Sequence, residues 1–88
     1  MGASVSRNSF DYKPVEIVPV IAGFDNDGKI IPLYVKLDGE KIKIDSYWVK
    51  SRFAGITEFR CKIIREDVMY PLVLTFYSEE SVWTIPKR

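Results

Sequence analysis

Residues 40–49 read EKIKIDSYWV, and this stretch decides the fold class of the chain. Apolar and polar side chains alternate along it, and Ile42, Ile44 and Trp48 fall on one face. Successive side chains of an extended backbone point to opposite faces, so period-two alternation is typical of a half-buried strand. We therefore predict a strand here, with Trp48 facing the interior and Tyr47 facing solvent.

A second stretch alternates in the same way. Residues 56–65 read ITEFRCKIIR, in which the odd-numbered side chains from Thr57 to Ile63 share one face and the even-numbered ones from Glu58 to Ile64 share the other. A buried cysteine behaves as a small hydrophobe, so Cys61 is expected in the core. The two stretches predict neighbouring strands that pack on a shared interior.

Turn signals divide the remaining chain into further short runs. Turn signals at 25–28, 38–39, 66–67 and 78–80 and a loop at 51–55 predict six strands, over 15–24, 29–37, 40–49, 56–65, 68–77 and 81–85. Three of these runs contain an internal proline, which places them at an edge or at a bulge: Pro19, Pro32 and Pro71. A helix from Ser46 to Ala54 is the one competing interpretation, but its aromatic and β-branched residues are weak helix formers.

These runs predict an all-β fold, a small antiparallel meander of five or six strands closing into a barrel or a strongly curled sheet. Its architecture resembles that of small SH3-like or OB-like barrels, a likeness that implies no function. Residues 1–13 are expected to form a flexible N-terminal tail, and residues 14–88 a single β-barrel-like domain. The predicted core consists of the inward-facing apolar side chains: Ile17, Ile21, Leu33, Val35, Leu37, Ile42, Ile44, Trp48, Phe59, Cys61, Ile63, Leu72, Leu74, Phe76, Trp83 and Ile85.

Composition excludes several kinds of chemistry. The 88 residues contain no His and a single Cys, so Ser-His-Asp and Cys-His catalysis, zinc fingers and disulfide scaffolds are ruled out. The acidic turn at 25–28 lacks the spacing of a calcium loop, and the five glycines form no phosphate-binding motif. We therefore predict no catalytic, cofactor-binding or metal-binding residues and a protein that is not an enzyme.

Basic residues concentrate in the middle of the chain. The formal net charge is +1, but residues 29–65 hold nine basic residues against four acidic ones. With sequential strand pairing, the outward side chains of three strands would form one basic face interleaved with tyrosines: Tyr34, Lys36, Lys41, Lys43, Tyr47, Arg60 and Lys62. Cations that follow phosphates and rings that stack on bases are typical of single-stranded nucleic-acid binding. The plain alternative is a solvated face in which Asp45 and Glu58 pair with lysines.

A second candidate site is the predicted loop at 51–55. It carries Arg52 and Phe53, residue types that often anchor protein partners. The alternative is that Phe53 folds back as a lid on the end of the barrel.

The functional expectation is a non-enzymatic interaction module with two competing versions. In the first it binds a protein partner or a second copy of itself, through an edge strand or the Phe53 loop. In the second it binds single-stranded nucleic acid on the basic face. The lone Cys and the lack of a secretory signal favour the cytoplasm. No uncharged run is long enough for a membrane span, so no membrane is expected as a partner. No metal is expected either, because no metal-binding residues are predicted.

Overall fold

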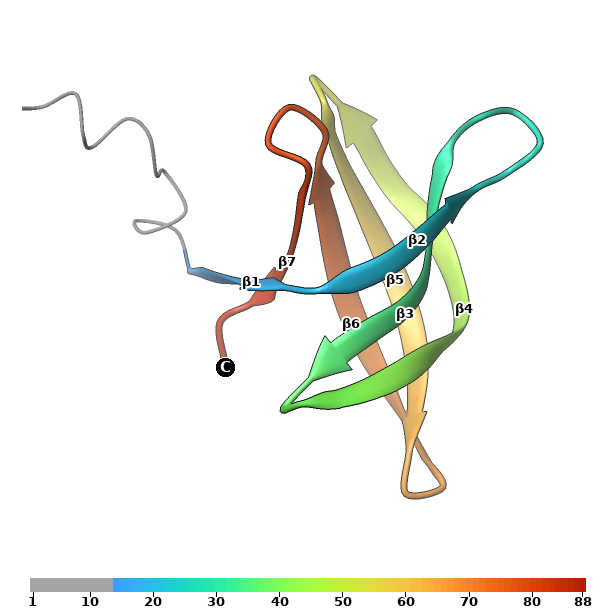
Figure 1. Cartoon of the computed structure of the whole chain (residues 1–88), viewed down its shortest axis with the longest axis vertical. Coiled ribbons are helices and arrows are strands. Elements are labelled where there is room, and N and C mark those ends of the chain that lie inside the picture. Colours follow the sequence, from blue (N-terminus) through green and yellow to red (C-terminus); the bar gives the residue numbers. More distant parts are fainter. Residues whose placement is uncertain (1–13) are drawn as a thin grey trace, which may run out of the picture.

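The structure is a computed structural model that describes residues 14–88, and every regular element in this range is a β-strand (Figure 1). The predicted N-terminal tail, residues 1–13, lies outside the described residues. The strands are β1 (Val15–Val18), β2 (Val20–Phe24), β3 (Ile30–Leu37), β4 (Glu40–Phe53), β5 (Ile56–Arg65), β6 (Val68–Tyr77) and β7 (Val82–Pro86). The all-β prediction is confirmed, and β4 occupies the segment where a helix was the alternative.

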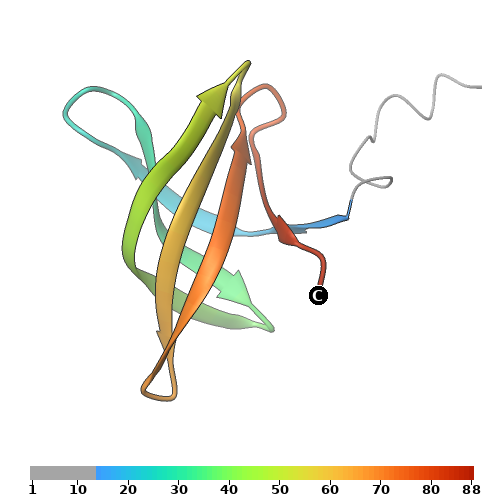
Figure 2. The ribbon, with the colours of Figure 1, turned by 180° about the vertical axis from the view of Figure 1, so that it is seen from behind.

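All neighbouring strands are antiparallel, and they form one strongly curled half-barrel sheet in the order β1-β7-β6-β5-β4-β3-β2. The two ends of this order, β1 and β2, are separated in the chain by Pro19 alone. Together they cross the open side of the curl (Figures 1 and 2). The two edge strands of the curled sheet are therefore linked through this proline.

Pro19 also explains why the structure has seven strands rather than five or six. Proline has no N–H to donate to a ladder. At Pro19 the chain changes partner, from β7 on one side to β3 on the other, and the Pro19 carbonyl accepts a hydrogen bond of 3.0 Å from the Lys36 N–H. The single strand predicted over 15–24 is thus two strands.

β4 is long and interrupted by two irregularities. Its first part pairs with β3, and from Ile44 onward it pairs with β5. The register shifts between Ile44 and Ser46, and again between Val49 and Ser51, as expected for β-bulges that leave Asp45 and Lys50 as extra residues. β4 continues to Phe53, so the loop predicted over 51–55 is a strand end followed by a two-residue turn.

The first bulge overturns two sequence predictions. An extra residue reverses the alternation of the side chains that follow it, up to the next bulge. Tyr47 consequently lies opposite Cys61 and turns inward, where its ring meets Phe59 edge-on at 5.8 Å between centroids. Trp48 lies opposite Arg60 on the outer face and is 55% exposed, so its assignment to the core was wrong.

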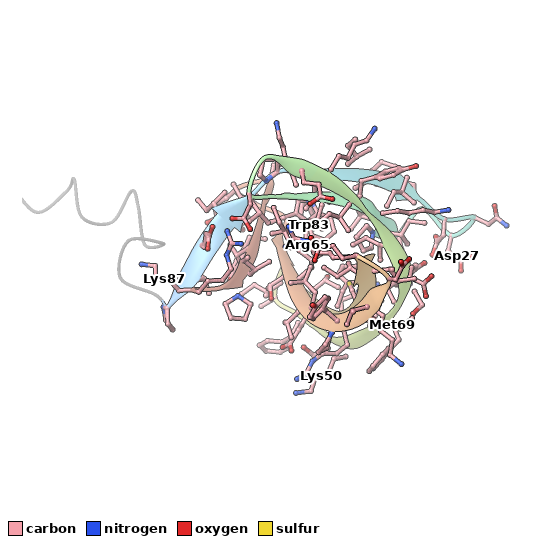
Figure 3. The ribbon with its side chains drawn as sticks, turned by 90° about the horizontal axis from the view of Figure 1, so that it is seen from below. Asp27, Lys50, Arg65, Met69, Trp83 and Lys87 are labelled. Carbon is pink, nitrogen blue, oxygen red and sulfur yellow. The ribbon has the colours of Figure 1, made fainter. Side chains whose placement is uncertain are left out.

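The core lies inside the curl. Its fully or largely buried apolar side chains are Val18, Val35, Leu37, Ile42, Ile44, Phe59, Cys61, Ile63, Leu74, Trp83 and Ile85, with Leu72 and Phe76 packed against them. Phe59, Phe76 and Trp83 form an aromatic stack with centroid distances of 5.6 and 4.8 Å around Trp83. Figure 3 shows Trp83 inside the curled sheet and Lys50 outside it.

Three further residues predicted in the core are 39–52% exposed: Ile17, Ile21 and Leu33. The first run, VEIVPVIAGF, is almost entirely apolar, so its pattern contains no signal for which face turns inward. Pairing with Trp83 and Val35 places Val18 and Val20 inward instead. Leu33 is the extra residue of a bulge in β3, and Pro32 is the buried side chain there.

Candidate functional site

Four residues of the predicted basic face lie together. Tyr34 pairs with Lys43, and Lys36 pairs with Lys41, across the β3–β4 ladder on the outer face. The Lys41 ammonium sits 4.9 Å from the centroid of the Tyr34 ring, a cation–π contact that occupies one face of this ring. These residues form a compact cationic group with one tyrosine.

The other three predicted residues do not extend this group as one face. Tyr47 is on the inner face, against Phe59. Arg60 and Lys62 are on the outer face of β5, on the far side of the bulge at Asp45. The Arg60 Nε lies 3.1 Å from Glu58 Oε2, so part of its charge is already paired.

The Arg52–Phe53 segment forms the end of β4, next to a turn at Ala54 and Gly55. Phe53 lies opposite Ile56 and is 80% exposed, so it does not fold back as a lid on the core. The Asp25 carboxylate accepts hydrogen bonds from the backbone N–H groups of Lys29 and Asp27, which lower its pKa. The positive charge of Arg52 adds to this lowering of the Asp25 pKa.

A cleft lies beside β6, where the sequence predicted no site. All ten residues of β6 pair with β5, but only Thr75–Tyr77 pair with β7. The stretch Val68–Leu74 therefore has no strand partner on its second side within residues 14–88. A cleft of about 940 Å³ opens here, and it reaches the core side chains Cys61, Leu72 and Ile85.

The alternation of the ladder shows which backbone groups of β6 face this cleft. The Ser78 N–H donates to the Gly55 carbonyl at 2.8 Å, on the β5 side of the strand. Because the direction of backbone groups alternates along a strand, the even-numbered residues of β6 bond to β5 and the odd-numbered ones face away from it. The groups toward the cleft are thus those of Met69, Pro71 and Val73, which offer three carbonyls and two N–H donors.

β6 is also the most regular of the incompletely paired strands. The β5–β6 ladder runs through ten consecutive residue pairs without a register shift. β4 likewise lacks a second partner beyond its bend, but its bulges at Asp45 and Lys50 interrupt the row of backbone groups. Bulges hinder the docking of another strand. The β6 edge is therefore the better template for one.

Strand lengths contained a signal for this edge. The predicted strand 68–77 has about twice the length of the predicted strand 81–85. A hairpin of two unequal strands leaves part of the longer one unpaired unless another element covers it. The sequence does not specify which element that is, because it depends on how the sheet curls.

Positive charge surrounds the cleft. Its walls include five basic side chains and one acidic one, namely Arg60, Lys62, Arg65, Lys87, Arg88 and Glu66. All three arginines are paired with acids outside the cleft: Arg60 with Glu58 at 3.1 Å, Arg65 with Glu40 at 3.0 Å, and Arg88 with Glu16 at 2.9 Å. Hydrogen bonding from Arg88 lowers the pKa of Glu16, and the charge of Lys87 contributes to this lowering. No ion pair joins Lys62 to another residue of the described range.

The Cys61 side chain at the base of the cleft is not an activated nucleophile. It is 2% exposed, and burial raises the pKa of its thiol to about 12. The thiolate is the reactive form, so a thiol with this pKa is inert at neutral pH. This agrees with the expected core role of Cys61.

Within residues 14–88, no three His, Cys, Asp or Glu side chains gather as a metal site would require. The same range holds no helix of the length and apolar character needed to span a membrane. No protein-family model, curated protein or solved structure matches the chain.

Proposed function

We propose that this chain is a non-enzymatic protein-interaction module that takes up an extended segment of another protein along β6. The observation that carries the proposal is the regular edge of Val68–Leu74 beside a cleft that reaches the core. Unpaired backbone groups in an exposed strand bind an added strand readily, and this mode of recognition is widespread among peptide-binding domains. A free thiol kept in the core suits a reducing compartment, which supports the expectation that the module acts in the cytoplasm.

Side chains beside the β6 edge would contact a bound segment in addition to the backbone hydrogen bonds. Leu72 and Ile85 provide apolar wall on the inner side of the cleft, and Trp48 provides an exposed aromatic surface on the outer side. Trp48 and Arg60 face each other across the β4–β5 ladder. Tryptophan and arginine are the residue types that most often dominate the free energy of protein binding.

Hydrogen exchange tests the edge without a known partner. We expect the amides of Met69 and Val73 to exchange rapidly, because they face the cleft, while those of Leu72 and Leu74, which bond to β5, are protected. The measurement is residue-resolved exchange by NMR. Strong protection of all four amides in the free protein would show that the edge is already covered and would remove the basis of the proposal.

The binding itself is tested with a displayed library of random nine-residue peptides. The intact protein should enrich a set of peptides, and Val73→Pro should bind none of them because it removes one of the two edge N–H donors and inserts a ring into the edge. Val73→Thr, which keeps the N–H and the β-branched shape, should bind as the unaltered protein does. Equal binding by the proline variant would exclude β6 as the docking strand.

Single-stranded nucleic acid is a second candidate ligand. The adjacent Tyr34, Lys36, Lys41 and Lys43 favour it. Binding of a labelled oligonucleotide would weaken steeply with salt, and Lys36→Glu with Lys43→Glu would abolish it while Val73→Pro would leave it unchanged. If no complex forms at low salt, this candidate is discarded.

A further inference from the structure

We infer that the segment bound along β6 is acidic and alternates acidic with apolar side chains. This inference rests on the proposed function, because it specifies the partner of the same edge. It follows from the placement of charges and apolar groups on the two faces of a strand laid against β6.

The outer face of such a strand would lie next to basic side chains. Lys62 lies opposite Pro71, and Arg60 lies opposite Val73. Both cations are therefore on β5, the strand next to the unpaired stretch of β6. Lys87 and Arg88 lie on the opposite side of the cleft, beyond the end of β7. A segment in the cleft would thus have cations on both sides, with Glu66 as the only acidic side chain of the cleft wall.

Within residues 14–88, internal ion pairs offset the three arginines and leave two lysines as the unpaired positive charges of the cleft. Arg60 is paired with Glu58, while Arg65 and Arg88 share Glu16, Asp38 and Glu40. Lys62 has no such partner in the described range, and Lys87 forms no ion pair there either. Carboxylates of an incoming segment would compensate these two lysines, whereas lysines or arginines would be repelled.

The inner face of the same segment would meet apolar surface. Leu72 and Ile85 border the opening, and behind them Leu37, Cys61 and Ile63 belong to the core. Side chains of a strand alternate between its two faces. A segment with apolar side chains at every second position and acidic ones between them therefore fits both faces at once.

A second copy of β6 fits less well. Residues 68–74 read VMYPLVL and carry no charge, so a symmetric pair of β6 strands would bring no carboxylate to Lys62. The two Lys62 residues would lie three strand spacings apart, about 14 Å, and each would remain without a carboxylate partner. Pro71 would also meet its counterpart, or a neighbouring position, without an N–H to donate. The missing carboxylate favours a different chain over a second copy, and a different chain would meet one edge proline where a second copy would pair two.

The test is the amino-acid composition of the peptides that are enriched from the random nine-residue library. We expect enriched peptides to be net negative, with acidic residues at alternate positions. The variant with Lys62→Glu and Lys87→Glu should bind the best acidic peptide about tenfold more weakly and select a less acidic set. The control is Lys29→Glu with Lys50→Glu, which makes the same change of net charge away from the cleft and should bind like the unaltered protein.

The outcomes separate this inference from the proposed function. Neutral or basic peptides that bind the intact protein but not Val73→Pro would refute the acidic partner and leave the β6 site standing. Enrichment of nothing, or enrichment that survives Val73→Pro, would refute the β6 site itself. A dimer in light scattering that Val73→Pro dissociates would assign the edge to a second copy. Oligonucleotide binding lost with Lys62→Glu and Lys87→Glu would assign the cleft to nucleic acid.

Discussion

Single residues define what this surface can do chemically. The arginines beside β6 are partly exposed and already share acids, so each contributes little to stability, and Lys62 and Lys87 are the unpaired cations of the cleft among the described residues. Cys61, the only thiol of the chain, is buried below them with a raised pKa. The residues around the cleft thus favour recognition of a charged, extended ligand, and the thiol is not available for chemistry.

The inertness of Cys61 is a testable property. Its raised pKa means that in the folded chain it remains protonated until about pH 12, whereas unfolding restores the ordinary, lower pKa. We expect an aromatic disulfide reagent at pH 8 to leave the folded protein unmodified and to label one thiol per chain in urea. Rapid, complete labelling without denaturant would contradict the burial of Cys61.

At the scale of elements, β4 shows how one extra residue changes a surface. Its bulge at Asp45 lies two residues before Tyr47 and exchanges the faces of Tyr47 and Trp48. The alternation of residues 40–44 was interpreted correctly, and the extension of the same phase to Trp48 was wrong. A bulge depends on the strand opposite, so the residues of β4 alone do not reveal it.

The two tryptophans report on this exchange. In Trp83→Phe the remaining Trp48 should emit at long wavelength and be quenched strongly by iodide, because its side chain is 55% exposed. In Trp48→Phe the remaining Trp83, 6% exposed, should emit at shorter wavelength and be protected from iodide. Equal quenching of the two variants would be inconsistent with this placement of Trp48.

At the scale of the whole molecule, the closure of the curled sheet and the unpaired edge of β6 have a common origin. The curl brings β1 to β7 and β2 to β3, which joins the two ends of the sheet at Pro19 (Figure 1). β7 is half the length of β6, so the same closure leaves Val68–Leu74 uncovered by any strand among residues 14–88. The core of the half-barrel and the proposed binding edge therefore depend on one arrangement of strands.

A matched pair of substitutions tests where the stability of this arrangement resides. Phe59→Ala removes a fully buried ring that packs against Trp83 in the aromatic stack and should lower the free energy of unfolding by about 3–5 kcal/mol. Phe53→Ala makes the same chemical change on a side chain that is 80% exposed and should alter it by no more than about 0.5 kcal/mol. Urea unfolding followed by circular dichroism gives both values, and similar losses would mean that the core is elsewhere.

The all-β class, the antiparallel connections and the inward positions of β5 could all be inferred from the chain itself. The reason is that they depend on local alternation and on turn residues such as Asp38–Gly39, where both residues have the positive φ of a tight hairpin turn. The faces of Tyr47 and Trp48, the break at Pro19 and the uncovered edge of β6 were decided by the register and extent of pairing between strands, namely β4 with β5, β1 with β7, and β6 with β7. Such pairings are set by which side chains can share one interior, and this is a property of the assembled sheet.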